Sequence, residues 1–238
     1  MVTYHVFVTL SVTLKVTPMM ESGKRPYSSE LRAGQARRTR RQIVAAAGDL
    51  FEQRGFAATT IDAVAARAGV SRKTVFTSVG NKVALLHLAY DYAMAGDDEL
   101  VPVIDRPELR RIIAEQDPWR QGQMYADFVT ATNGRTSKLW MALRGAAEVD
   151  QEARQLYEKW EDERRTAMRN GPIPVFVEKK ALRTGLTPDT AADLMWTLID
   201  PALYHRLVHR AGWTPEKFRE WLTYTIRTQI LQLELSGG

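Results

Sequence analysis

The strongest structural signal in this chain is a pair of short helices joined by a glycine turn, within residues 59–76. Thr60 is a good N-cap residue for a first helix with apolar side chains on one face. Gly69 follows, and glycine adopts the positive φ that a sharp turn between two helices requires. Ser71 then caps a second helix. The pattern predicts two helices that cross at a tight turn.

The side chains around this turn suit two helices that cross closely. Ala65 is small enough for a close approach, and Val75 is a β-branched residue that fills the space between the helices. Val70 and Val75 occupy the two positions of a hydrophobic staple. These spacings are typical of a helix-turn-helix. The alternative is a helical hairpin that binds no nucleic acid.

Basic residues concentrate around the same segment. Residues 24–82 contain twelve Lys or Arg and only four Asp or Glu, whereas the whole chain has a net charge of only +5. The second helix begins Ser71-Arg72-Lys73-Thr74, which places short donors and two cations at a helix N-terminus, where they suit phosphates and base edges. Asn81-Lys82 is the expected start of a further helix that could hold another phosphate. This charge distribution favours a polyanion-binding module attached to an acidic remainder.

The composition excludes several other classes of protein. The 238 residues are 45% hydrophobic, which is typical of a globular chain, and none is Cys, so disulfide scaffolds and Cys-based zinc sites are excluded. No apolar run reaches the ~18 residues of a membrane-spanning helix, so we expect a cytoplasmic protein without a membrane partner. Residues 2–16 alternate apolar and polar side chains in the manner of a strand, and Met19 or Met20 could be the true start.

From about Arg40 onward the periodicity is helical, and we predict an all-α fold. The first helix ends at Gly55, a residue suited to the position after a helix. Proline residues separate the later helices and give several of them their first residue. Residues 21–38 form a polar arm. The predicted helices after the glycine turn cover residues 81–95, 107–115, 118–133, 136–147, 151–170, 188–211 and 214–235.

The motif residues resemble those of the tetracycline-repressor (TetR) family of transcriptional regulators. The resemblance runs from Ile43 to Leu85 and includes Leu50-Phe51, Gly55-Phe56, Thr59-Thr60, Ala68-Gly69-Val70-Ser71, Thr74, Phe76 and Lys82. It implies an N-terminal three-helix helix-turn-helix domain, with residues 71–77 as the recognition helix, followed by a larger helical bundle for ligand binding and dimerisation. The DNA-binding residues it suggests are Thr60, Ser71, Arg72, Lys73, Thr74, Phe76, Lys82 and Arg40.

Three positions depart from the family pattern. The family usually has Tyr where this chain has Phe76, and His and Phe where it has Ser78 and Val79. We therefore expect weaker anchoring to the DNA backbone there, offset by Arg72, Lys73 and the arginines of residues 37–41. These arginines could enter a minor groove, follow phosphates, or remain solvated.

The resemblance also divides the chain and assigns partners to it. We expect a poorly ordered extension and basic arm over residues 1–36, a DNA-binding domain over 37–96, and an effector-binding and dimerisation domain over 97–238. Residues 188–211 and 214–235 are apolar around much of their circumference, which favours a homodimer that binds a near-palindromic double-stranded operator. Repression relieved by a small apolar effector is the hypothesis, and activation stays open.

The effector pocket is expected among aromatic and thioether residues of the second part. Such residues more often form plain core than ligand contacts, but together they favour an apolar effector over a sugar or a nucleotide. The candidates are Trp119, Met124, Phe128, Trp140, Met141, Tyr157, Trp160 and Met168.

Enzyme motifs are missing from the sequence. His205 and His209 have the spacing of two metal ligands on one helix, with Asp200 or Glu220 as a third, but no His-Glu-x-x-His pattern, P-loop or Gly-x-Ser-x-Gly is present. We therefore expect no catalytic residues, no metal and no cofactor. Two alternatives remain: a sequence-independent, nucleoid-type DNA binder, and a metal-dependent enzyme that uses His205 and His209.

Overall fold

The computed structural model describes residues 26–96 and 106–232. Within these ranges the chain consists of helices and their connections, together with one isolated β-bridge between Leu182 and Leu231. The predicted all-α class is therefore confirmed. None of the helices in these ranges is both long and apolar enough to cross a membrane.

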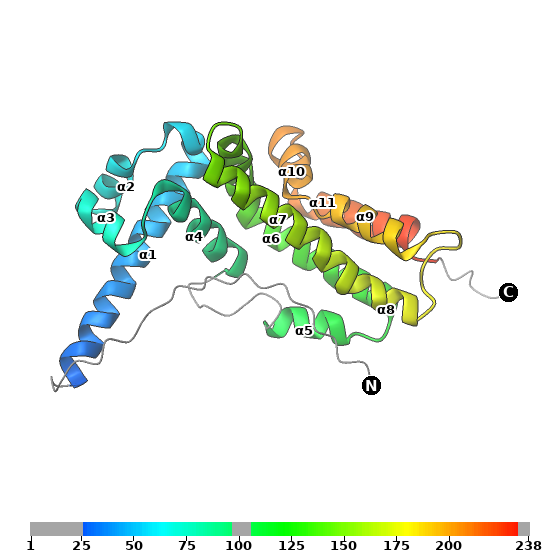
Figure 1. The fold of residues 1–238 in the computed structure, drawn as a ribbon. Coiled ribbons are helices and arrows are strands. Elements are labelled where there is room, and N and C mark those ends of the chain that lie inside the picture. Colours follow the sequence, from blue (N-terminus) through cyan, green and yellow to red (C-terminus); the bar gives the residue numbers. More distant parts are fainter. Residues whose placement is uncertain (1–25, 97–105, 233–238) are drawn as a thin grey trace.

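The first four helices form the N-terminal part of the molecule. They are α1 (Pro26–Ala58), α2 (Ile61–Ala68), α3 (Arg72–Ser78) and α4 (Lys82–Ala95). Helices α2 and α3 lie beside the C-terminal half of α1, and the N-terminal half of α1 projects away from the rest of the protein (Figure 1). A kink at Gly55, with φ 73°, interrupts α1 where its end was predicted.

Helix α1 begins earlier than the sequence analysis expected. Pro26 occupies the first position of the helix, where its fixed φ is favourable and its missing N–H is not needed. The interpretation of residues 26–36 as a poorly ordered arm is corrected, because they continue the helix that carries the first buried residues, Ile43 and Val44. The strand pattern of residues 2–16 lies outside the described residues.

The turn between α2 and α3 has the predicted geometry. The Thr60 side chain accepts a hydrogen bond from the N–H of Ala63 at 3.1 Å, and Gly69 ends α2 with φ 68° and ψ 31°. The N–H of Val70 donates to the carbonyl of Ala65 at 3.0 Å, which closes the end of the helix. Local capping therefore fixes both helix boundaries.

The second part of the molecule is a bundle around one long helix. The sequence analysis expected a break between residues 133 and 136, but α6 continues through it, and α8 and the subdivision of residues 188–211 were not predicted. The elements are α5 (Pro107–Ala114), α6 (Pro118–Ala147), α7 (Gln151–Asn170), α8 (Pro172–Glu178), α9 (Pro188–Leu198), α10 (Pro201–Tyr204), the π-helix η2 (His205–Arg210), α11 (Pro215–Thr225) and the π-helix η3 (Ile226–Ile230).

Helix α6 joins the two parts through a shared hydrophobic core. It packs against α1 and α4 on one side and against α7, α10 and α11 on others. One cluster of buried residues runs from Ile43 and Leu50 of α1, through Leu86 of α4, to Trp140 of α6 and Trp160 of α7. A second cluster fills the far end of the bundle. Helices α1 and α4 thus pack directly on the bundle, and α2 and α3 pack on α1.

The glycine turn predicts a contrast between two substitutions. Gly69→Ala places a side chain at positive φ and should destabilise the protein by roughly 1 kcal/mol, although an added Cβ would meet no atom within 4 Å. Gly145→Ala, at an equally open position in α6, should stabilise it by up to about 1 kcal/mol, because alanine is the better helix former. Urea unfolding of both variants measures this. Equal effects of the same sign would contradict the conformational argument.

Candidate nucleic-acid interface and ligand cavity

Helix α3 presents an open face beside α2. Its N-cap, Ser71, accepts a hydrogen bond from the N–H of Thr74 at 3.0 Å, and its hydroxyl lies 2.8 Å from that of Thr74. Val75 is fully buried and anchors the helix to the core. Lys73 and Phe76 are exposed, Phe76 by 44% of its surface. The N-terminal turn of α3 therefore carries polar and cationic groups that are accessible to a partner.

Arg72 has an exchangeable ion pair on the same surface. Its guanidinium lies 2.9 Å from the carboxylate of Asp62, and both side chains are more than half exposed. The guanidinium carbon also lies 5.6 Å from the centre of the Phe76 ring. An exposed pair of this kind contributes little stability, so Arg72 can transfer to a phosphate at small cost.

Lys82 is turned away from this face. Its ammonium lies 4.1 Å from the centre of the Phe56 ring and 3.5 Å from the carbonyl of Ala57. Burial lowers the pKa of Lys82, and the nearby carboxylate of Asp150 partly restores it. The preceding residue, Asn81, donates a hydrogen bond of 2.8 Å to Glu152 at the start of α7. The N-terminus of α4 therefore contacts the bundle.

The remaining candidates for DNA contact lie on α1 and α2. Thr60 is exposed at the start of α2, and its hydroxyl is occupied as a helix cap. Arg40 is half buried on α1, and its Nε atom has no hydrogen-bond partner among the described residues. The structure thus brings Ser71, Arg72, Lys73, Thr74 and Phe76 together on α3 and leaves Lys82 and Arg40 apart from them. The DNA contacts themselves stay a prediction.

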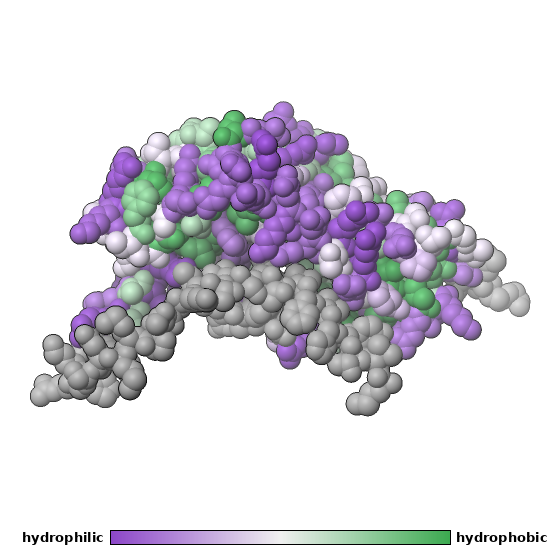
Figure 2. Space-filling model, viewed as in Figure 1, coloured by the Kyte–Doolittle hydropathy of each residue, from purple (hydrophilic) through white to green (hydrophobic). Residues whose placement is uncertain are grey.

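The projecting half of α1 is strongly basic. Residues 31–48 include five arginines and no acidic residue, and the surface of this half is hydrophilic where Figure 2 shows it. Four of these arginines are exposed, namely Arg32, Arg37, Arg38 and Arg41. The sequence analysis noted this charge but missed that a helix holds it in a fixed arrangement.

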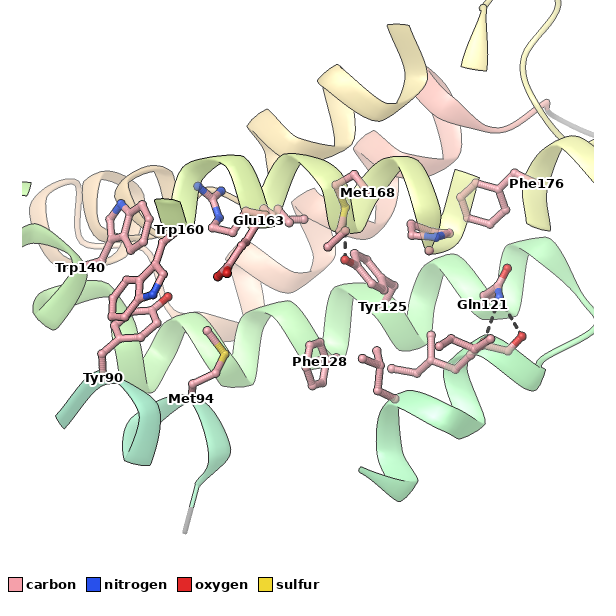
Figure 3. Close-up of a pocket in the computed structure, with 18 residues that line it drawn as sticks. Tyr90, Met94, Gln121, Tyr125, Phe128, Trp140, Trp160, Glu163, Met168 and Phe176 are labelled. Atoms are coloured by element: carbon pink, nitrogen blue, oxygen red, sulfur yellow. Dashed lines mark hydrogen bonds between the residues drawn. The ribbon is translucent and has the colours of Figure 1, made fainter. Parts of the chain in front are cut away.

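A cavity of about 190 Å³ lies among α4, α5, α6, α7 and α8. Figure 3 shows side chains from these helices around it. Four predicted ligand-contact residues line it, namely Phe128, Trp140, Trp160 and Met168. The other four do not: Met141 and Tyr157 pack against the first core cluster, and Trp119 and Met124 pack against the second.

Other lining residues escaped the sequence analysis. Tyr90 and Met94 belong to α4, which the predicted domain boundary places in the DNA-binding part, and Glu163 was not among the predicted contact residues. Tyr125 and Phe176 also line the cavity. The sequence of α4 carried one signal for this role. Apolar residues cover more than one face of the helix, and Tyr90 is one of them, so burial against a second neighbour could be expected.

The cavity is mainly apolar, with a few polar groups. The Tyr125 hydroxyl donates to the sulfur of Met168 at 3.3 Å, and the side-chain amide of Gln121 donates to the carbonyl of Ile112 at 2.9 Å. The indole N–H groups of Trp140 and Trp160 are buried and have no partner in the described part of the chain. Such a lining suits an apolar molecule with a small number of polar groups.

An acidic group of side chains borders the cavity where α4 meets α7. Burial, together with the Glu163 carboxylate and against the opposing Lys159 ammonium, raises the pKa of Asp91 to about 7. Burial also raises the pKa of Glu163, which Lys159 opposes from 3.7 Å. Burial and Lys159 lower the pKa of His87, whose ring nitrogen lies 3.4 Å from Asp91. The interface between α4 and α7 therefore carries carboxylates whose negative charge is only partly balanced by nearby cations.

Comparisons with known proteins agree with this geometry. Residues 43–89, which span the glycine turn and α3, match the family model described as bacterial regulatory proteins of the tetR family. The DNA-binding part of the chain, residues 43–89, therefore matches the TetR family. One relative is the uncharacterized HTH-type transcriptional regulator YdeS of Bacillus subtilis (strain 168). It is 28% identical over 170 residues, which cover 71% of this chain and 79% of YdeS.

Solved TetR-like structures share the whole fold. NalD of Pseudomonas aeruginosa, the secondary repressor of the MexAB-OprM multidrug efflux pump, superposes with a TM-score of 0.65 at 21% identity, over 84% of this chain and 99% of NalD. The fatty acid degradation regulator FadR of Bacillus halodurans gives a TM-score of 0.61 at 13% identity, over 86% of this chain and 96% of FadR. The matched family consists of bacterial regulatory proteins, and the proteins in these two structures are a repressor and a regulator.

The two candidate metal ligands lie close together without a third. The rings of His205 and His209 have their centres 5.3 Å apart on η2. Within residues 26–96 and 106–232, no group of three His, Cys, Asp or Glu side chains is arranged to hold a metal ion.

The raised pKa of Asp91 makes stability depend on pH. Ionised Asp91 is unfavourable in the folded protein, so its contribution to stability should fall as pH rises from about 4 to about 7. Asp91→Asn removes this charge and should raise the melting temperature, by more at about pH 8 than at about pH 5. Thermal unfolding at both pH values measures the difference.

Asp162→Asn is the matched control, because Asp162 is an exposed carboxylate on α7. Its effect should be small and the same at both pH values. If Asp91→Asn lowers the melting temperature at the higher pH, Asp91 is stabilising as a carboxylate and the argument fails.

Proposed function

We propose that this protein is a homodimeric transcriptional repressor, working in the cytoplasm, that leaves a near-palindromic operator when a small apolar effector enters the cavity. The observation that carries the proposal is that α4 connects the two sites. At its N-terminus α4 follows the recognition helix α3, and near its C-terminus Tyr90 and Met94 line the cavity.

The accessible tip of α3 supports binding to duplex DNA. Arg72 and Lys73 can contact phosphates or guanine edges, and Thr74 supplies a short donor beside them. Phe76 lacks a hydroxyl for a phosphate and offers an apolar ring for a thymine methyl group instead. The arginines of α1 add a second cationic surface, suited to the DNA backbone.

Contacts along α4 support the coupling between the two sites. Asn81 binds Glu152 at the N-terminus of the helix, and Arg135 of α6 donates to the carbonyls of Ala93 and Met94 at 2.7 and 3.2 Å at its C-terminus. An effector that displaces α4 therefore has to change these contacts. It releases DNA only if it binds the conformation that cannot bind the operator more tightly.

Dimerisation through α9, α10 and α11 is supported by their apolar surface. Leu194 on α9 and Tyr224 on α11 are exposed by 38% and 66%, although both are large apolar residues. Half-buried Trp213 and Trp221 lie on the same segment of chain. In a two-fold dimer the recognition helices would reach major grooves about 34 Å apart.

The DNA-binding proposal predicts the effect of Lys73→Ala. Loss of this exposed cation should weaken binding to the operator by about 1–3 kcal/mol. The slope of log affinity against log salt concentration should become shallower by about one, as expected for the loss of one phosphate contact. Gel-shift titrations with the gene's own upstream DNA and with a scrambled duplex, at several salt concentrations, measure both effects. Arg120→Ala removes an exposed charge on the bundle and should change neither.

Two outcomes would count against sequence-specific regulation. Equal affinity for the upstream and the scrambled duplex would favour the nucleoid-type binder. Unchanged binding by Lys73→Ala would remove α3 from the interface.

The dimer proposal predicts the effect of Tyr224→Glu. A charge placed in an apolar interface lacks a partner and should weaken the dimer by at least tenfold, on the order of 1.4 kcal/mol. Val149→Glu places the same charge at an apolar residue that is 77% exposed in the turn after α6, and should leave association unchanged. Sedimentation equilibrium measures the dimer dissociation constant of both variants. If Tyr224→Glu dimerises as well as Val149→Glu does, the interface lies elsewhere.

A further inference from the structure

One end of the cavity is built from stacked aromatic rings. The Tyr90 ring lies 4.3 Å from that of Trp160 between centres, and the Trp140 ring lies 6.2 Å from Trp160 in a nearly parallel arrangement. All three side chains are at least 96% buried. Faces of electron-rich rings attract cations, most strongly where water is excluded.

The carboxylate of Glu163 points into the same end of the cavity. Figure 3 shows it between the aromatic group and Met94, on the side of α7 that faces α4. Its nearest cation, the Lys159 ammonium, is 3.7 Å away and belongs to a side chain that is half exposed. Solvent therefore screens this pair, and Lys159 balances the charge of Glu163 only in part.

The charges around Glu163 do not balance. Asp91 of α4 is a second carboxylate close by, and one of its oxygens is buried without a hydrogen-bond partner among the described residues. Burial and Lys159 lower the pKa of His87, which disfavours its charged form. Among the described residues, Lys159 is the cation that acts on both Asp91 and Glu163.

Arg164 does not fill this deficit. Its guanidinium binds Glu161 at 2.9 Å, and the two side chains are only 15% and 19% exposed. The same guanidinium donates to the carbonyl of Trp196 at 3.2 Å and lies 5.1 Å from the centre of the Trp140 ring. Arg164 thus shows that a cation is stable against this aromatic group, while its own charge is already paired.

The opposite end of the cavity is mainly apolar. Phe128, Tyr125, Met168 and Phe176 lie along it, away from Glu163 (Figure 3). An elongated ligand would therefore meet an acidic aromatic wall at one end and a mainly apolar wall, with the Tyr125 hydroxyl and the Gln121 amide, at the other. A sulfonate or a carboxylate at the first end would be repelled by Glu163.

From this arrangement we infer that the effector is an amphipathic organic cation, with its cationic head between Glu163 and the Tyr90–Trp160 rings and its apolar body toward Phe128 and Phe176. The inference rests on the proposed function, since it names the chemical class of the effector for the same cavity.

Three probes with the same alkyl chain test the class of the head group: decyltrimethylammonium, decan-1-ol and decyl sulfate, all below their micellar concentrations. Calorimetry with the full-length protein should give the cation an affinity at least about tenfold higher than the other two. Tryptophan fluorescence provides a second readout, because Trp140 and Trp160 line the site. Equal or tighter binding of the alcohol or the sulfate would overturn the inference.

Variants of Glu163 separate charge from packing. Glu163→Gln should lower the affinity for decyltrimethylammonium by about tenfold and leave that for decan-1-ol unchanged, because only the cation uses the charge. Glu163→Asp retains the charge and should keep the preference for the cation. Glu158→Gln is the control, as Glu158 is an exposed carboxylate on the same helix. Equal losses for the cation and the alcohol in Glu163→Gln would show a packing role only.

The gel-shift assay distinguishes failure of this inference from failure of the proposed function. Decyltrimethylammonium should release the wild-type protein from operator DNA, and Glu163→Gln should need about tenfold more of it. Specific DNA binding without any preference for the cation would overturn the inference and leave the regulator intact. A preference for the cation without specific DNA binding would support the ligand class and overturn the proposed function as a regulator.

Discussion

The aromatic packing of α4 against α6 and α7 is the interaction on which the arrangement of the molecule depends. Tyr90 of α4 lies in tilted ring contact with Trp140 and Trp160, in a core that is continuous from α1 to α7. The same rings form one wall of the cavity. The surface that holds the helix-turn-helix against the bundle is therefore also a surface that a ligand would contact. Because close-packed interiors resist continuous deformation, a ligand there has to change the position of α4 or bind weakly.

The helix-turn-helix could be predicted from the sequence because its structure is local. Thr60, Gly69 and Ser71 determine their helix boundaries through hydrogen bonds and φ angles within a few residues of each, and these are visible in the order of the amino acids. The length of α6 could not be predicted in this way. Asn133 and Gly134 are typical of a helix end, but the Asn133 amide donates to the carbonyl of Ile199 at 3.1 Å. Gly134 leaves room for the Tyr204 hydroxyl, which an added Cβ would approach to 3.4 Å. These residues serve contacts with a distant helix, which local rules do not record.

The cavity could be predicted only in part. Its aromatic character is a property of composition, so half of the proposed contact residues do line it. Which face of each helix meets the cavity depends on packing, and for this reason Trp119 lies under Arg227, whose guanidinium carbon is 4.6 Å from the centre of its ring. Tyr90 and Met94 could not be predicted as cavity residues from a boundary near residue 96, because α4 belongs to both functional parts. The charge of Glu163 was visible in the sequence, but its desolvation was not.

The continuity of α1 gives the molecule a rigid arm. The helix extends from the buried Ile43 back to Pro26, a distance of about 25 Å at the usual rise per residue. If its base tilts by about 10° when the core beneath it repacks, the far end moves by about 4 Å, by the geometry of a helix of that length. A displacement too small to matter within the core would then be magnified at the arginines of α1. The arm would act as a lever that converts sub-ångström repacking around α4 into a shift comparable with the spacing between phosphates.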